Sequence, residues 1–167
     1  MERAELESTL ETLHPASFGW ALSCCRRDRQ EADEVLQMSY LKIIEGKARF
    51  DGRSSFKTWL FAVIRRTALE RFRWQRVRRI VFLETSPPAR PDQILESSER
   101  TERLLRALDA ISRRQREVVE LVFYHDMTIE EAAQSLGISI GSARVHYERS
   151  KRRLLAILQE EERIAFA

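Results

Sequence analysis

The sequence predicts an all-α protein of two small helical domains joined by a flexible linker, with a helix-turn-helix in the second domain. Apolar residues recur at the three- and four-residue spacings of amphipathic helices, and strand patterns are scarce. Glycine and proline are few, with 5 and 4 residues in a chain of 167. Three of the prolines fall in one segment rich in Ser and Glu. These features predict domains over 1–83 and 101–167 and a linker over 84–100.

Four helices are expected before the linker, over residues 2–13, 16–27, 31–45 and 55–79. The third has a buried stripe and an acidic outer side. That side could receive a basic partner, or its acids could simply favour the helix N-terminus through the helix dipole. The stripe consists of Ala32, Val35, Leu36, Tyr40 and Ile43, and the outer side of Asp33, Glu34, Gln37 and Lys42.

The fourth predicted helix begins apolar and ends rich in arginine. Residues 65–79 hold seven arginines and one acid, Glu70, a composition that suits a phosphate backbone. Exposed aromatic rings beside arginines also suit unstacked bases, although an acidic membrane or a partner protein could meet the same surface. For Trp59 alone, a place in the core is favoured over a role as a stacking platform. The predicted core stripe is Phe56, Leu60, Val63, Ile64, Ala68 and Phe72, and Trp59, Phe61 and Trp74 fall largely outside it.

The positive charge of the chain is local. Residues 1–50 carry 7 basic and 9 acidic side chains, whereas residues 51–84 carry 9 and 3, so the net charge of +3 understates a basic binding face. The apolar run 59–64 is far shorter than the roughly 20 residues that span a bilayer. Without a secretion signal at the start, the protein is expected in the cytoplasm, not inserted in a membrane. Adjacent Cys24 and Cys25 are interpreted as buried thiols, with a redox role left open.

The second domain carries the more specific motif. Helices are expected over 101–111, 113–124, 128–135 and 140–159, the first two as packing support. Thr128 with Glu131 three residues later forms a capping box, and Gly137 suits a tight turn. The last helix carries five basic residues and one acid, a charge that suits phosphates and the major groove of DNA. The alternative is an ordinary helical hairpin whose basic face is only solvated, and we prefer DNA binding.

Enzymatic chemistry finds little support. His14, His125 and His146 lie apart, and the chain has no Gly-rich phosphate loop and no Cys/His or paired-carboxylate arrangement. We therefore expect a protein that is not an enzyme and that uses no cofactor or metal.

Three segments in this order carry a family resemblance: "EADEVLQMSYLKII", "FDGRSSFKTWLFAVIRRTALERFRW" and, after the linker, "ALDAISRRQREVVELVFYHDMTIEEAAQSLGISIGSARVHYERSKRRL". The chain resembles an extracytoplasmic-function (ECF) sigma factor, a two-domain subunit of bacterial RNA polymerase in the sigma-70 family. The likeness covers nearly the whole chain. A helix-turn-helix regulator that does not join the polymerase remains the alternative, but it would leave the first domain without a task.

The resemblance implies partners and site residues. The partners are core RNA polymerase, through the largest-subunit coiled coil and the flap region, promoter DNA and, in many relatives, an anti-sigma factor. Docking on core polymerase is implied for Asp33, Glu34 and Gln37. Reading of the −35 element as duplex is implied for Ser142, Arg144, Val145, His146, Glu148, Arg149, Lys151 and Arg152. Holding of the melted −10 strand is implied for Arg53, Ser54, Ser55, Phe56, Lys57, Trp59, Arg65, Arg66, Arg73 and Trp74.

The chain departs from the family pattern in both binding helices. Where the family commonly has Asn and, four residues later, Asp, this chain has Arg66 and Glu70, and Ser142-Ala143 replaces the usual Thr-Val. Promoter sequence is therefore not transferable from relatives. Tyr147 could contact DNA or pack inward.

Overall fold

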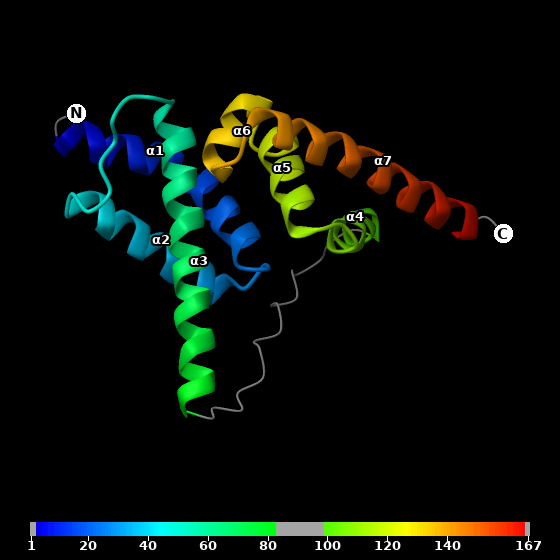
Figure 1. The fold of residues 1–167 in the computed structure, drawn as a ribbon, viewed down its shortest axis with the longest axis horizontal. Helices are drawn as coiled ribbons and strands as arrows, with labels where there is room; N and C mark the ends of the chain where they lie inside the picture. The colour runs from blue at the N-terminus through cyan, green and yellow to red at the C-terminus, as the bar shows by residue number, and fades with distance from the viewer. Residues whose placement is uncertain (1–2, 83–98, 166–167) are drawn as a thin grey trace. The chain divides into compact units, whose positions relative to one another are not determined.

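The computed structural model describes residues 3–82 and 99–165, and every regular element in these two ranges is a helix (Figure 1). The chain forms two compact units, Met1–Asp92 and Gln93–Ala167. The all-α prediction is confirmed, whereas residues 84–98 of the predicted linker lie outside the described part. The helices are α1 (Arg3–Cys24), α2 (Arg29–Ile44), α3 (Phe56–Phe82), α4 (Glu99–Asp109), α5 (Arg113–Phe123), α6 (Ile129–Leu136) and α7 (Ile140–Ala165).

The first two predicted helices are one continuous helix, which corrects the prediction of separate helices over 2–13 and 16–27. Pro15 lies inside α1, where it cannot donate the usual backbone hydrogen bond. The helix packs along both α2 and α3, so burial on both sides of the proline outweighs its local cost. The buried side chains of α1 on the two sides are Leu10, Ser17, Trp20, Ala21 and Cys24.

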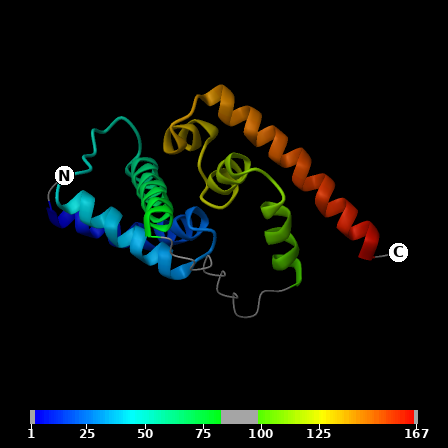
Figure 2. The same ribbon diagram turned by 60° about the horizontal axis from the view of Figure 1, so that its bottom comes forward.

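The core of the first unit lies where α1 meets α3. Figure 2 shows α3 strongly foreshortened, seen largely along its axis. The Trp20 ring stacks on Phe61 at 5.7 Å between centroids, and its indole N–H donates to the Phe61 carbonyl at 3.0 Å. Phe61 is fully buried, so its expected place outside the core stripe was wrong. The reason is that α3 packs against both α1 and α2 and therefore buries a wider arc than one stripe.

The turn between α1 and α2 follows the two cysteines, which are buried thiols as the sequence predicted. Arg26 and Arg27 both adopt left-handed backbone conformations, with φ of 56° and 66°. The Arg27 N–H closes the helix end by donating to the Leu22 carbonyl at 2.8 Å. The Asp28 side chain then caps α2 by accepting from the Glu31 N–H at 3.0 Å.

The second unit packs α5, α6 and the first part of α7 together, while α4 lies against α7. A capping box at Ser112 and Gln115 starts α5. The fully buried Ser150 hydroxyl of α7 donates to the Gln115 carbonyl at 3.1 Å, which ties the last helix to α5. A core cluster of Ala107, Leu108, Ile111, Val119 and Leu154 joins α4, α5 and α7.

Candidate nucleic-acid interface

The helix-turn-helix is built by local hydrogen bonds that the sequence predicted. The Thr128 hydroxyl accepts from the Glu131 N–H at 3.1 Å, and the Glu131 carboxylate accepts from the Thr128 N–H at 2.9 Å. Gly137 ends α6 in the left-handed conformation, with φ of 63°. The Ser139 hydroxyl then caps α7 by accepting from the Ser142 N–H at 3.1 Å. These contacts fix the angle at which α7 leaves the turn.

The recognition helix α7 turns one side inward and leaves the other open. Ala143, Ser150 and Leu154 are buried, whereas His146 and Tyr147 are half-buried. The Tyr147 ring stacks on the exposed Phe123 ring of α5, with 5.8 Å between the ring centroids. Of the two alternatives for Tyr147, DNA contact or packing inward, packing inward therefore holds in part. The other predicted readers are all exposed: Ser142, Arg144, Val145, Glu148, Arg149, Lys151 and Arg152.

Two of the cations among the predicted readers on α7 already have partners. Arg144 donates to the Glu130 carboxylate of α6 at 3.2 Å. Lys151 lies 3.0 Å from the Glu148 carboxylate and 4.6 Å from the centre of the Tyr147 ring. Glu130 is a residue that sequence reasoning missed. In the sequence Glu130 is only an acid in the first turn of α6, and its contact with Arg144 becomes apparent only where α6 and α7 cross.

The first unit presents a second candidate surface at the start of α3. The Ser55 hydroxyl caps this helix by accepting from the Thr58 N–H at 3.1 Å. In the loop before it, Arg53 pairs with Asp51 at 3.1 Å. Phe50, Phe56 and Trp59 form a half-buried aromatic cluster, with ring centroids 5.2–5.4 Å apart. Trp59 therefore belongs partly to the packing and partly to the surface.

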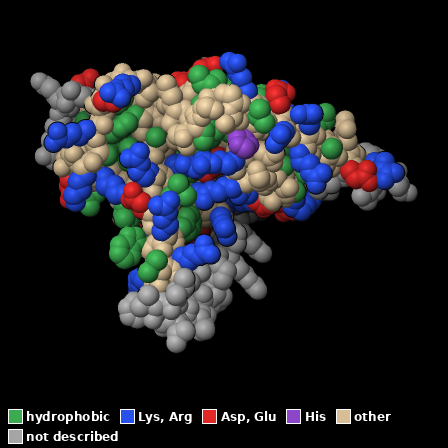
Figure 3. Space-filling model, in the orientation of Figure 1, with side chains coloured by type: hydrophobic (Ala, Val, Ile, Leu, Met, Phe, Trp, Pro, Cys, Tyr) green, Lys and Arg blue, Asp and Glu red, His purple; other side chains and the backbone are tan. Residues whose placement is uncertain are grey.

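The other residues predicted to contact the melted −10 strand differ in how exposed they are. Arg65 is buried, which removes it from the open surface because it lies on the side of α3 that packs into the unit. Arg66, Arg73 and Trp74 are exposed, and Lys and Arg side chains (blue) surround the lower part of α3 in Figure 3. Lys57 is half-buried, with its amino group 5.8 Å from the centre of the Phe61 ring.

The outer side of α2 is less acidic than its sequence indicates. Asp33 and Gln37 are exposed, but the Glu34 carboxylate accepts from the Arg71 guanidinium of α3. Arg71 also donates to Glu31 at 2.6 Å, and this hydrogen bond, together with the two carboxylate charges, raises the pKa of Arg71. Lys42, predicted to lie outside, is half-buried and pairs with Glu70 at 2.6 Å.

The same side of α2 carries exposed apolar residues that sequence reasoning missed: Met38, Leu41 and Ile44. Their three-residue spacing places them off the predicted buried stripe, and this was the available signal. Among the described residues, no cluster of His, Cys, Asp and Glu is arranged to hold a metal ion. Within the same residues, none of the helices has the length and apolar character needed to cross a membrane.

Comparison with known proteins decides the family. Residues 9–78 match Sigma-70 region 2, and residues 101–154 match Sigma-70, region 4. The RNA polymerase sigma factor CarQ of Myxococcus xanthus is 31% identical, over 78% of this chain and 76% of CarQ. The chain belongs to the ECF sigma factors. This sigma factor is also 29% identical to the ECF RNA polymerase sigma factor SigX of Bacillus subtilis (strain 168), over 81% of its own length and 76% of SigX.

Solved structures share the fold of this sigma factor. RpoE, solved in complex with the anti-sigma factor NepR from Bartonella quintana, matches with a TM-score of 0.75 and 22% identity, over 93% of this chain and 97% of RpoE. CnrH, solved in complex with the cytosolic domain of CnrY, matches with a TM-score of 0.64 and 21% identity, over 92% and 87% of the two chains. As a sigma factor, the protein has RNA polymerase core and promoter DNA as its partners.

Proposed function

We propose that this sigma factor docks on core polymerase through the outer side of α2, reads the −35 element as duplex with α7, and holds the melted −10 strand with the loop before α3 and α3 itself. It acts by binding, without catalysis of its own, in the cytoplasm where the polymerase works. The observation that carries the proposal is the outward row of predicted readers on an α7 that is fixed at both its start and its middle.

Duplex reading rests on the chemistry of the exposed side of α7. Arg144 and Arg149 offer the forked donors that pair with guanine in the major groove, and both lie in the N-terminal half of α7, the part of a recognition helix that meets base edges. Lys151 and Arg152 lie further along and suit phosphates. The half-buried His146 contributes less surface than the other predicted readers.

Strand holding rests on the aromatic cluster of Phe50, Phe56 and Trp59. A half-exposed ring beside basic side chains suits an unstacked base, because every base has a π-face. Arg53, Ser54 and Ser55 lie in the chain between Phe50 and Phe56, and Arg66 and Arg73 follow the cluster on exposed positions of α3. A duplex-only regulator would have no use for such a surface, and this disfavours the alternative function.

An anti-sigma factor is proposed as a further partner. The related RpoE was solved with the anti-sigma factor NepR, so a protein of this fold is able to bind an anti-sigma factor. Binding of such a protein to this chain would compete with core polymerase for one or both units.

The test is run-off transcription with bacterial core polymerase, with and without this protein, on promoter fragments from its own genome, including its own upstream region. We expect initiation that depends on the protein. Changing Arg144 and Arg149 together to Ala should abolish promoter selection, and Asp33→Lys should weaken core binding. Matched controls are Arg163→Ala, near the far end of α7, and Glu11→Lys, an exposed acid of α1.

Two outcomes would contradict the proposal. One is tight, specific duplex binding by the protein alone with no stimulation of the polymerase, which would indicate a conventional regulator. The other is equal loss of activity in the control variants, which would show that charge in general, and not these surfaces, supports initiation.

A further inference from the structure

The Arg144 side chain of α7 is held by a residue from another helix. Its Nη2 atom donates to Oε1 of Glu130, in the first turn of α6, at 3.2 Å. Glu148, four residues further along α7, has the spacing for an ion pair within the helix, but its carboxylate lies 3.0 Å from the Lys151 amino group instead. Arg144 is therefore oriented across the helix-turn-helix and not along its own helix.

The two helices that carry this pair are fixed close to the pair itself. Ala132 and Ala133 of α6 and Ala143 of α7 are buried, and such small side chains allow two helices to approach closely. The hydroxyl caps described above hold the first turn of each helix. Because Ala143 directly precedes Arg144, the backbone positions of Arg144 and Glu130 are set by the fold itself.

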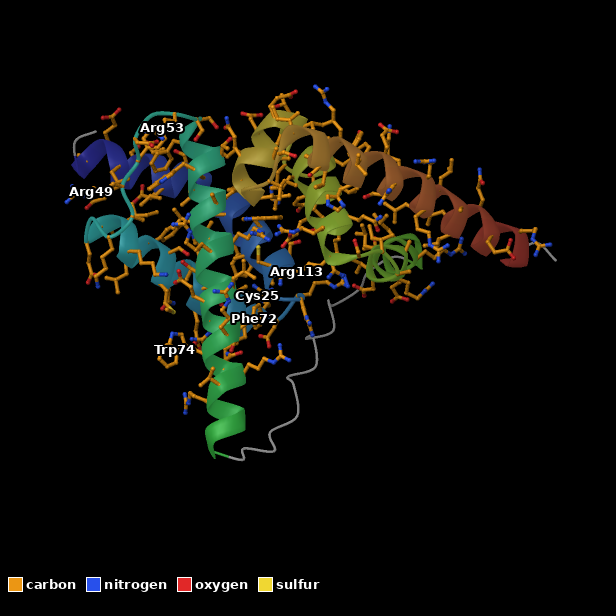
Figure 4. All side chains as sticks on the ribbon, viewed as in Figure 1. Cys25, Arg49, Arg53, Phe72, Trp74 and Arg113 are labelled. Atoms are coloured by element: carbon orange, nitrogen blue, oxygen red, sulfur yellow. The ribbon has the colours of Figure 1, made fainter. Side chains whose placement is uncertain are left out.

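The pair differs from a contact that holds the fold together. The side chains of Arg144 and Glu130 are 64% and 52% exposed, and open pairs of this kind contribute little to stability. By contrast, Glu117 is buried and accepts from Arg113 within α5 at 3.0 Å. In Figure 4 Arg113 lies at the end of α5 that is remote from the start of α7. The Arg144–Glu130 pair instead lies on the exposed side of the helix-turn-helix, where DNA reading is proposed.

The contact constrains the group that would meet a base. A guanidinium group has several N–H donors in one plane, and Glu130 engages only one of the terminal nitrogens of Arg144. Reading of guanine requires two further donors, directed at O6 and N7. A carboxylate at one corner fixes the plane of the group, so less side-chain freedom is lost when the base is bound. The negative charge of Glu130 also repels phosphates, which lowers the affinity for every DNA sequence.

We propose that Glu130 is a positioning residue for −35 selectivity, which holds the Arg144 guanidinium in the orientation that reads one base pair. It acts on the base only through Arg144. This inference rests on the proposed function, in which Arg144 reads the −35 duplex, and adds a residue for which the family resemblance implied no role. When DNA covers the exposed side of α7 and excludes water, the attraction between the two charged groups becomes stronger and their geometry is held more firmly.

The experiment uses holoenzyme formed with the full-length chain. It measures binding to promoters with each single substitution in the −35 element and to a fragment that contains no promoter. In Glu130→Ala we expect the preference at the base pair read by Arg144 to fall about tenfold, while preferences at the other positions stay within about twofold of the wild type. Binding to the promoter-free fragment should rise about twofold at low salt, because a repulsive charge is lost.

Three further variants separate positioning from charge. Glu130→Gln keeps an acceptor oxygen but no charge, so it should show the same rise on promoter-free DNA and keep most of the base preference. In the Arg144→Ala background, Glu130→Ala should cause no further loss of preference, because the side chain that it positions is gone. Glu160→Ala removes the acid of another exposed pair on α7, with Arg163 at 2.7 Å, and should leave base preference unchanged.

The melting temperature of Glu130→Ala should fall by at most about 4 °C, the effect of losing one favourable charge at a helix start. Unchanged base preference in Glu130→Ala, or an equal loss with and without Arg144, would overturn the positioning role while leaving the proposed function intact. A similar loss at every position of the −35 element would overturn it too, since that result indicates a general structural effect. Absence of any −35 preference in the wild-type holoenzyme would instead contradict the proposed function.

Discussion

At the residue scale, Arg71 is the main polar link between α2 and α3. It is bound by Glu31 and Glu34, and all three side chains are at least partly withdrawn from water, with 23%, 22% and 40% exposure. The Lys42–Glu70 pair links the same helices at 2.6 Å but is more open, at 28% and 48% exposure. Pairs that are partly desolvated and share several hydrogen bonds contribute more to stability than open pairs.

Arg71→Ala is therefore expected to lower the free energy of unfolding of the first unit by about 1–2 kcal/mol, because it leaves two carboxylates without their partner. Lys42→Ala, the matched change in the more open pair, should cost less than about 1 kcal/mol. Urea unfolding followed by tryptophan fluorescence measures this unit alone, since Trp20, Trp59 and Trp74 all belong to it. Equal losses in the two variants would contradict the ranking.

Arg26 tests backbone strain in the turn after α1. Its left-handed conformation costs a residue with a Cβ about 1 kcal/mol, and glycine adopts it freely. Arg26→Gly should thus raise the unfolding free energy by about 0.5–1 kcal/mol, in the same fluorescence assay. The control Glu11→Gly, in the regular part of α1, should lower it by about 1 kcal/mol. Destabilisation by Arg26→Gly would show that the arginine side chain matters more than its backbone.

At the element scale, local capping contacts determine where the helices of the second unit begin and end. Thr128, Ser139 and Ser112 each satisfy an N-terminal backbone N–H with a hydroxyl, and Gly137 ends α6 in the left-handed region. These contacts join residues three apart in sequence, so they were predictable for Thr128 and Gly137. The long α1 shows the opposite case, because its continuity through Pro15 depends on packing against two other helices.

Gly137→Ala should destabilise the second unit by about 1 kcal/mol through backbone strain alone, since a Cβ there would meet nothing within 4 Å. Gly141→Ala is the matched control: it lies in the first turn of α7, its Cβ would come no closer than 4.0 Å to Ser139 Oγ, and it should stabilise the unit by about 0.5–1 kcal/mol. Hydrogen exchange of the amides in α5, α6 and α7 measures both changes. Equal effects of the two substitutions would refute the assigned role of Gly137.

At the scale of the whole molecule, the two units carry positive charge on different kinds of surface. On α7 the cations stand on a regular exposed helix side suited to duplex DNA, whereas on α3 they follow a half-exposed aromatic cluster suited to separated bases. A polymerase subunit that both finds and opens a promoter requires both. The division explains why a modest net charge of +3 is compatible with the two proposed nucleic-acid surfaces.

In promoter binding by the holoenzyme, Arg144→Ala should relax preference at one position of the −35 element, with a loss of about 1–3 kcal/mol for the preferred base only. Arg152→Ala should weaken all promoters to a similar degree and reduce the slope of log affinity against log salt by about one. The measurement is holoenzyme binding to promoters with single −35 substitutions over a range of salt. A uniform loss in Arg144→Ala would assign that residue to phosphate contact instead.

Sequence alone was sufficient for the all-α class, the helix-turn-helix and the two basic surfaces, because caps, turns and helical periodicity are properties of residues a few positions apart. The tertiary structure decided which of the predicted residues are open. Phe61 and Arg65 are buried because α3 packs against two helices. The Glu34 carboxylate of α2 is paired with Arg71, which comes from α3. Exposure and pairing depend on contacts between distant segments, and these are absent from any local pattern.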